Sequence, residues 1–293
     1  MQLALRQTLP DREDVPSRRC LFDLSVALVE DVASPGTVPE NGTRAFSPDF
    51  QIALPYRGLF VWHVGEDEVV GDANQAIFVT AGEACRLTQP LAGGFGELIF
   101  TPAASVVAEL AHELGGALRG HALFRRRSRF LTPGLQSFRA LFLRWARAPA
   151  GVDALAAEEL VLAFLRAALE ADRPLPVPGR ATQKLIRRTK AFLEAELSQP
   201  IRLADVGRAV GASPAYLTHV FRLVEGVPLH QYLTQLRLAR ALEELPEADD
   251  LTGLALELGF SSHSHFSASF HRAFRTTPSE FRQRSRRRVQ PSI

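Results

Sequence analysis

Imidazole, hydroxyl, methyl and guanidinium groups gather in one short segment near the end of the chain. They belong to His263, Ser264, His265, Ser267, Ala268, His271 and Arg272. On one face of a helix, such small and hydrogen-bonding groups are the kind that read base edges in the DNA major groove. The same residues on the solvated face of an ordinary helical hairpin would have no such role, so the elements that hold them decide between the two interpretations.

A tight helix–turn–helix is predicted around this face. Phe266, Phe270 and Phe274 recur at four-residue steps, which indicates a helix with one apolar stripe that begins after Ser261 or Ser262. The segment LTGLALEL before it predicts a short apolar helix, and the Gly-Phe pair that follows marks the turn. Two helices joined in this way hold the second one rigidly enough to enter a groove.

This unit is the second copy of a repeat. Leu203–Pro228 can be aligned with Leu251–Pro278, with Gly211 and Gly259 matched at a spacing of 48 residues and one residue added after the turn. In the first copy Ser213-Pro214 supplies an N-cap side chain and a proline at the first helical position. Each copy therefore predicts a helix, a glycine turn and a second helix.

A long amphipathic helix is predicted between the two copies, from His230 to Leu245. At about 1.5 Å per residue it spans about 24 Å. Its leucines can pack against both copies and fix their separation. Two reading helices roughly one DNA turn apart, about 34 Å, meet successive major-groove faces on one side of a duplex.

These C-terminal motifs resemble a known family. ALELGFSSHSHFSASFHRAF, TTPSEFR and the connecting HQYLTQLRLARA closely resemble the double helix-turn-helix domain of AraC/XylS-type transcriptional regulators. The segment PYRGLFVWHVGEDEVVGDANQAIFVTAGEACRLTQP is similar to the cupin-type sensing domain of such regulators. The resemblance implies that the chain binds double-stranded DNA, acts on RNA polymerase, more commonly as an activator, and responds to an unknown small-molecule effector.

The same resemblance implies roles position by position. The residues expected to face bases or phosphates are Ser213, Ala215, Thr218, His219, Arg222, Ser262, His263, Ser264, His265, Ala268 and Arg272. The two arginines and the helix N-termini at the two N-cap serines suit phosphates. Ala215 and Ala268 offer thymine a methyl contact but no bidentate hydrogen bond, so the histidines must carry more of the readout. A surface histidine without a role in DNA binding is the alternative for each of them.

Charge is divided unevenly along the 293 residues. From Arg180 onward there are 17 Lys and Arg against 11 Asp and Glu, whereas the preceding part carries an acidic excess. This favours a nucleic-acid-binding C-terminal domain, although the basic tail at 286–293 can equally be a solvated end. No apolar run is long enough to span a membrane and no secretion signal opens the chain, so we expect a cytoplasmic protein. Cys20 and Cys85 are expected to be free thiols rather than a disulfide.

The N-terminal part of the chain has a different sequence pattern. Residues 1–20 are expected to be a flexible N-terminus, and short alternating segments separated by turn residues then predict an antiparallel sandwich or small barrel over 21–102. Apolar helical stripes follow over 103–172, and these helices either form the subunit interface of a homodimer or cover the barrel. Alternating prolines predict a semi-rigid linker at 173–182, which places the DNA-binding domain at 183–285.

The barrel region offers little for catalysis. The side chains of metal-ligating type in it and in the helices after it are His63, Glu66, Glu83, Cys85, His112 and His121. They lack a paired-histidine pattern, so we expect no metal, no cofactor and no enzyme activity. An apolar interior can still hold a small molecule. The residues on strand-like runs assigned to this effector site are Phe60, Trp62, His63, Phe78 and Cys85. Ordinary core packing is the alternative for the aromatic ones.

We therefore expect an α+β protein of two domains: an N-terminal cupin-like small β-barrel with appended helices, and an all-α domain of two helix-turn-helix units joined by a long helix. The expected function is that of a sequence-specific DNA-binding transcriptional regulator controlled by an effector in the barrel. Two alternatives stay open. One is a metal-dependent cupin enzyme with a helical appendage, and the other is a small-molecule-binding module whose helical half contacts protein.

Overall fold

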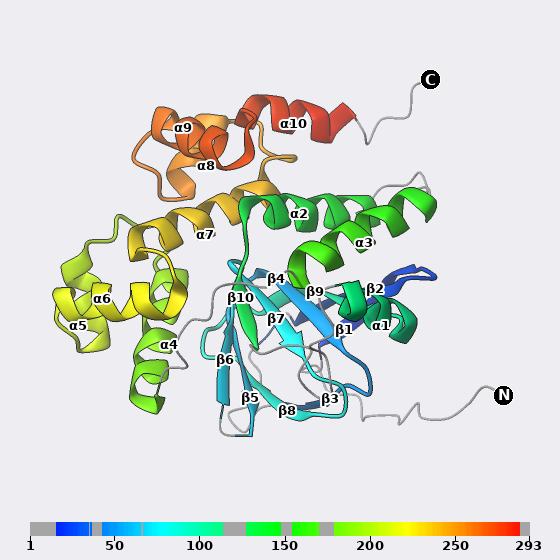
Figure 1. Ribbon diagram of the computed structural model, residues 1–293. Helices are drawn as coiled ribbons and strands as arrows, with labels where there is room; N and C mark the ends of the chain where they lie inside the picture. Colours follow the sequence, from blue (N-terminus) through cyan, green and yellow to red (C-terminus); the bar gives the residue numbers. More distant parts are fainter. Residues whose placement is uncertain are drawn as a thin grey trace.

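The computed structural model describes residues 16–34, 36, 43–65, 67–113, 127–147, 154–169 and 179–287. Strands dominate the first hundred residues and helices the rest (Figure 1). The strands are β1 (Ser17–Asp23), β2 (Ala27–Ser34), β3 (Thr43–Phe46), β4 (Gln51–Arg57), β5 (Phe60–Val64), β6 (Asp67–Gly71), β7 (Gln75–Val79), β8 (Ala84–Thr88), β9 (Phe95–Pro102) and β10 (Ser128–Phe130). The helices are α1 (Ala104–Glu113), α2 (Pro133–Arg147), α3 (Ala154–Leu169), α4 (Arg180–Ala195), α5 (Leu203–Val210), α6 (Pro214–Glu225), α7 (Leu229–Glu244), α8 (Leu251–Glu257), α9 (His263–Phe274) and α10 (Pro278–Arg287).

The strands form two antiparallel sheets that face each other. One has the order β1-β2-β9-β4-β7-β10 and the other the order β3-β8-β5-β6. Apolar side chains of both sheets form one buried cluster between them: Val32, Ala53, Phe60, Trp62, Val69, Ile77, Val79, Cys85, Leu87, Phe95 and Ile99, which we call the sandwich interior. Within the described residues no strand of one sheet pairs with a strand of the other. The chain thus forms an open sandwich rather than the closed barrel expected, because the edge strands β3 and β10, of four and three residues, leave little backbone to pair across the gap.

Helices α1, α2 and α3 cover the other face of the six-stranded sheet. Phe100 on β9 lies 5.9, 5.4 and 4.7 Å, between ring centroids, from Phe138, Phe142 and Phe164. Successive side chains of a strand point to opposite faces of the sheet, so Phe100 points to the helices whereas its neighbour Ile99 points into the sandwich interior. These helices lie where apolar stripes predicted them, and they cover the sheet. The short strand β10 lies within the segment expected to be helical and pairs with β7.

Helix α7 joins two helical clusters in the C-terminal part. Its first half, with Tyr232 and Leu236, packs with α4, α5 and α6, whereas Leu238 and Leu242 of its second half pack with α8 and α9. The connecting helix therefore contacts both units, as its amphipathic pattern predicted. Helix α4 begins at Arg180, within the segment expected to be linker, and residues 170–178 of that region lie outside the described part of the chain.

The two parts of the chain contact each other along α2, α4 and α7. Helix α7 passes over β4 and beside α2, while α4 lies against β6 (Figure 1). Helix α2 also contacts α9, where Ala140 joins the apolar cluster of the second unit. Both helical units therefore rest on the N-terminal part.

Candidate nucleic-acid interface

The first helix-turn-helix unit is α5, a glycine turn and α6. The C-cap of helix α5 is Gly211, whose φ of 71° is the left-handed conformation that glycine adopts without a Cβ penalty. Helix α6 begins at the N-cap Ser213, whose side chain accepts a hydrogen bond from the backbone N–H of Tyr216, with Pro214 at its first position. The local signals predicted from the sequence are therefore the ones that shape this unit.

The second unit, α8 and α9, repeats the plan with different caps. Asp250 caps α8 by accepting hydrogen bonds from the backbone N–H groups of Thr252 and Gly253 at 2.8 and 2.9 Å. Gly259 forms the turn at φ 81°. Ser262 caps α9 by accepting from the backbone N–H of His265 at 3.1 Å.

Each second helix buries one apolar stripe and leaves the opposite face free. On α6 the buried side chains are Leu217, Val220 and Phe221, and on α9 they include Phe266 and Phe270. These positions match at the 49-residue spacing seen in the sequence, so the faces left over match as well.

The exposed face of α6 holds most of its expected contact residues. Ala215, His219 and Arg222 are exposed, and so is the cap residue Ser213. Thr218 is half-buried, and its hydroxyl donates to the backbone oxygens of Pro214 and Ala215, each at 3.0 Å. The hydroxyl of Thr218 is thus turned to its own helix, whereas the others face outward.

The exposed face of α9 presents Ser264, His265, Ala268 and Arg272, beside the exposed cap residue Ser262. His265 also contacts the turn before α9, because its Nδ1 lies 3.1 Å from Ser261 Oγ and its ring packs edge-on against Phe260 at 5.4 Å.

One expected contact residue of α9 is less free than the others. His263 is half-buried, and its Nε2 lies 3.4 Å from Ser267 Oγ. His263 is therefore less available to a partner than Ser264 or His265.

Two large side chains on α6 were missed by sequence reasoning. Tyr216 is 54% and Leu223 is 48% exposed, on the edge of the face that holds His219. Tyr216 stands at the repeat position of His265, and that alignment was the signal that could have found it. Beside this face lies a groove of about 460 Å³ between α5, α6 and α7, whose lining includes Arg222 and the unassigned His230.

The C-terminal arginines are largely engaged with the chain itself. Arg282 donates to the carbonyl oxygens of Ala248 and Asp249 at 2.9 and 2.8 Å. Arg286 donates to the carbonyl oxygen of Pro246 at 2.9 Å and pairs with the carboxylate of Asp249 at 2.9 Å. They hold the loop between α7 and α8. Residues 286 and 287 of the expected tail belong to helix α10. Residues 288–293 lie outside the described part.

The five residues assigned to an effector site lie on different surfaces. Phe60, Trp62 and Cys85 point into the sandwich interior. Phe78 points to the helix-covered side of the sheet. His63 faces outward near α4, with its Nε2 2.7 Å from Thr88 Oγ1 and its Nδ1 3.7 Å from Glu68, which Arg187 of α4 binds. Burial and then the nearby Arg86 lower the pKa of His63, although Glu68 opposes this.

The sandwich interior also holds polar groups that the sequence did not single out. Glu97 is 2% exposed, and its Oε2 has no hydrogen-bond partner among the described residues. Burial raises the pKa of its carboxyl to about 8. The indole N–H of Trp62 and the amide of Gln89 likewise lack described partners. A ligand or ordered water there would satisfy them.

Metal-ligating side chains do not cluster in the described part of the chain, where no group of three or more His, Cys, Asp or Glu is placed to hold a metal ion. Of the candidates, Glu83 binds Arg127 at 2.7 and 3.0 Å, and Cys85 is buried. Glu66 and His121 lie outside the described residues. No described helix is long and apolar enough to cross a membrane.

Comparison with known proteins bears on this interface. A family model described as a helix-turn-helix domain matches residues 206–284. The transcriptional activator RhaR of Klebsiella pneumoniae is 35% identical over 144 residues, which are 48% of this chain and 50% of that relative. The chain thus spans about half the length of RhaR. The regulatory protein SoxS of Escherichia coli K12 is 35% identical over 103 residues, which are 35% of this chain and 96% of SoxS.

Two solved structures are also similar. An AraC-type DNA-binding regulator from Chromobacterium violaceum is 30% identical over 39% of this chain and 100% of that one, with a TM-score of 0.34. ToxT from Vibrio cholerae is 14% identical over 89% of this chain and 96% of that one, with a TM-score of 0.37. Because the match at 35% identity takes in 96% of SoxS, and the helix-turn-helix model covers residues of both units described above, the chain belongs to the AraC/XylS-type family of transcriptional regulators.

Proposed function

We propose that this regulator binds duplex DNA with α6 and α9 in successive major-groove segments. The observation that carries the proposal is the pair of matched, exposed faces on one support. Ala215 and His219 on α6, and Ser264 and Ala268 on α9, are exposed at equivalent positions, while α7 packs against both units and fixes their separation. Two reading helices held on one support can meet two major-groove segments on one side of a duplex when they lie about 34 Å apart.

Within each face we assign contacts by chemistry. His219, Ser264 and His265 carry groups that hydrogen-bond to base edges, and the two alanines suit thymine methyl groups. Thr218 and His263 take supporting roles, since both side chains already have partners within their helices. Arg222 and Arg272, with the capped N-termini at Ser213 and Ser262, suit phosphates. These roles extend what the family membership states.

The test is binding of the full chain to duplex DNA selected from random sequence. The double variant Arg222→Ala, Arg272→Ala should bind more weakly on all sequences and show a salt dependence reduced by about two counterions, since each phosphate contact contributes about one. Arg240→Ala on α7, an exposed arginine paired with Glu244, is the matched control. Full-length protein that selects no sequence at low salt would contradict the proposal.

We further propose that the N-terminal sandwich holds a small-molecule effector, with Phe60, Trp62 and Cys85 as apolar lining. The unpartnered polar atoms of Glu97, Gln89 and Trp62 support this, because a bound polar ligand would satisfy them. Phe78 and His63 are left out because they point to other faces. A thermal-shift screen should find ligands whose stabilisation is lost in Glu97→Ala, and stabilisation that persists in this variant would place the ligand elsewhere.

The proposal also covers the oligomeric state of the regulator and its effect on transcription. We propose a homodimer formed through the helices after the strands, supported by the exposed apolar side chain of Leu155 on α3, which is 65% exposed. Sedimentation of the wild type and of Leu155→Arg tests the dimer, and an unchanged oligomeric state in that variant would contradict this interface.

We also propose that the DNA-binding domain starts at α4 and that the bound regulator contacts RNA polymerase, as an activator.

A further inference from the structure

A turn of the N-terminal part is bonded to the first helix-turn-helix unit by buried polar groups. It consists of residues 72–74, which join β6 to β7, and of Gln75, the first residue of β7; we call this segment the 72–75 turn. Its members Asp72, Ala73, Asn74 and Gln75 are 1%, 6%, 0% and 2% exposed. Turns of this composition normally face water, where their polar groups are hydrated. Here the polar groups of the turn are shielded from water, so other groups of the protein must form hydrogen bonds with them.

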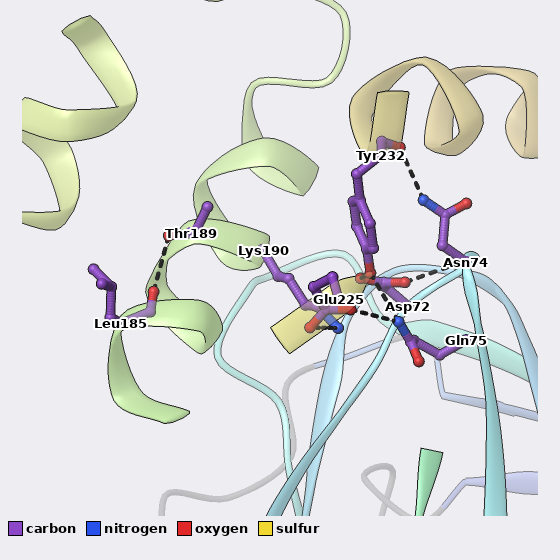
Figure 2. Close-up of polar contacts among 8 residues, drawn as sticks. All are labelled: Asp72, Asn74, Gln75, Leu185, Thr189, Lys190, Glu225 and Tyr232. Carbon is purple, nitrogen blue, oxygen red and sulfur yellow. Dashed lines mark hydrogen bonds and ion pairs between the residues drawn. The ribbon is translucent and has the colours of Figure 1, made fainter. Parts of the chain in front are cut away.

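Three side chains of the turn converge on Tyr232 of α7 (Figure 2). The Tyr232 hydroxyl donates to Asp72 Oδ2 at 2.6 Å, and its carbonyl oxygen accepts from Asn74 Nδ2 at 2.9 Å. Gln75 Nε2 lies 3.3 Å from that hydroxyl and donates to Glu225 Oε2 at 2.9 Å. Burial and the neighbouring Asp72 raise the pKa of Tyr232, so its hydroxyl stays protonated as the donor.

Glu225 carries these contacts on to the first reading helix, because it is the last residue of α6. Its Oε1 pairs with Lys190 Nζ of α4 at 3.0 Å, with side chains 9% and 4% exposed. Lys190 Nζ also lies 5.2 Å from the centre of the Tyr232 ring. Buried ions add little adhesion over apolar packing, but they tolerate few arrangements. The network therefore fixes how α4, α6 and α7 are oriented on the N-terminal part.

The turn is itself held rigidly from the other side. Asp72 Oδ1 accepts from the backbone N–H of Asn74 at 2.9 Å. Gln136 and Arg139 of α2 donate to Asn74 Oδ1 at 2.9 Å and to the carbonyl oxygen of Ala73 at 2.8 Å. A turn with this many bonds cannot shift without moving its partners.

The strand that leaves the turn leads directly into the sandwich interior. Ile77, two residues after Gln75, lies in that interior with Phe60. At Gly71, just before the turn, a Cβ would stand 2.5 Å from the Phe60 ring and 2.6 Å from Ile77 Cδ1. The backbone just before the turn thus packs directly against Phe60 and Ile77, so we expect a change in interior packing to displace the strands on either side of the turn.

We propose that the 72–75 turn is a coupling element that transmits changes in the sandwich interior to the first reading helix through Tyr232 and Glu225. The element extends the proposed effector control, and it acts by setting the orientation of α6 rather than by covering its exposed face. Such coupling requires that the 72–75 turn and α6 keep their contacts and move together between two arrangements.

Distances between spin labels in the full-length protein test this without DNA, so failure is distinguishable from a failure to bind DNA. Cys20 is exposed and Cys85 is buried, which leaves Cys20 as the label site of the N-terminal part. Arg208→Cys on α5 and Glu257→Cys on α8, both exposed, supply the second label in two separate proteins. Labelled protein is diluted with unlabelled protein to remove contacts between copies.

In the Asn74→Ala, Gln75→Ala variant the distance distribution to residue 208 should widen at least twofold, and that to residue 257 should widen less. Tyr232→Phe is the second variant, because it removes only the hydroxyl and keeps the ring contacts with Phe221 and Phe130 at 5.2 and 5.6 Å. It should widen the same distribution to a smaller extent. An unchanged distribution in either folded variant would overturn the proposal.

Two controls separate the turn from general loosening. Arg144→Ala breaks the 2.8 Å hydrogen bond from α2 to Ser285 of α10 and should leave the distance to residue 208 unchanged. Ile77→Ala should widen that distance, whereas Val32→Ala, which also empties space in the interior but on the distant strand β2, should not. Equal widening by Ile77→Ala and Val32→Ala, or by Arg144→Ala and the turn variant, would refute coupling through this turn.

Discussion

The turn of the first helix-turn-helix unit faces open space at Gly211, whereas the turn of the second is enclosed at Gly259. Both glycines are left-handed, with φ of 71° and 81°. A Cβ on Gly211 would meet nothing within 4 Å, but a Cβ on Gly259 would stand 2.6 Å from the Leu197 carbonyl oxygen and 2.7 Å from Arg237 Nη2. The same local motif is thus free in one unit and packed in the other.

The close packing around Gly259 connects the turn of the second unit with another part of the fold. Arg237 of α7 donates to the carbonyl oxygens of Leu197 and Gln199 at 2.9 and 2.7 Å, and its guanidinium lies 6.0 Å from the centre of the Phe260 ring. One side chain therefore ties the loop after α4 to the turn of the second unit. The comparison teaches that the second turn also sets how the two units lie together, whereas the first shapes only its own unit.

Alanine at the two turn glycines should separate these roles most strongly. Gly211→Ala should cost about 1–2 kcal/mol, the penalty of a left-handed Cβ. Gly259→Ala should cost about 3 kcal/mol or more, because the Cβ must also displace backbone and a buried guanidinium. Urea unfolding of the full chain measures both. Equal costs would mean that the packing around Gly259 relaxes freely.

The reading faces should differ in how far DNA affinity and stability can be separated. His219 makes no hydrogen bond to another described residue, so His219→Ala should weaken DNA binding by about 1–2 kcal/mol and leave unfolding unchanged. His265→Ala should weaken binding and also lower stability by about 1 kcal/mol, since His265 contacts Ser261 and Phe260. Titration of a selected DNA site and thermal unfolding supply the two numbers. Loss of stability in His219→Ala would contradict the distinction.

The helix C-caps offer a smaller contrast. The C-cap of α6 is Gly226 at φ 77°, whereas the C-cap of α9 is Arg275 at φ 55°, a left-handed arginine. Arg275→Gly should therefore raise stability by about 0.5–1 kcal/mol, and Gly226→Ala should lower it by about 1 kcal/mol. The sign of the Arg275→Gly effect in denaturant unfolding decides this point, and a loss of stability would show that the arginine side chain contributes more than its backbone costs.

The N-caps should give the least difference. Ser262→Ala should cost about 1 kcal/mol, because the Ser262 side chain satisfies a backbone N–H of α9. Ser213→Ala should cost about half as much, because Pro214 already presets the first turn of α6 and the cap bond is longer, 3.3 against 3.1 Å. Comparison of the two melting temperatures checks the order, and a larger loss for Ser213→Ala would reverse it.

Much of the C-terminal half was predictable from local pattern. The repeat, the glycine turns, the serine caps and the contact of α7 with both units follow from residues close in sequence, such as Ser213-Pro214 and the phenylalanines of α9. The repeat alone could have placed Tyr216 with His265, but whether a tyrosine at that position is exposed depends on which side of α6 is covered by α5. The assignment of Phe78 and His63 to one interior failed because a strand alternates its faces, and which face is inward depends on the partner sheet.

The sequence by itself determined the two reading units, since helix periodicity, caps and left-handed glycines act within a few residues of one another. It also determined that basic residues are in excess from Arg180 onward and acidic residues in the preceding part of the chain. Only the tertiary structure decided that Asp72, Asn74 and Gln75, which read as an ordinary solvated turn, are buried against Tyr232 and Glu225 some 150 residues away. The physical reason is that burial and pairing of polar groups are properties of the packed chain, and no local spacing records them.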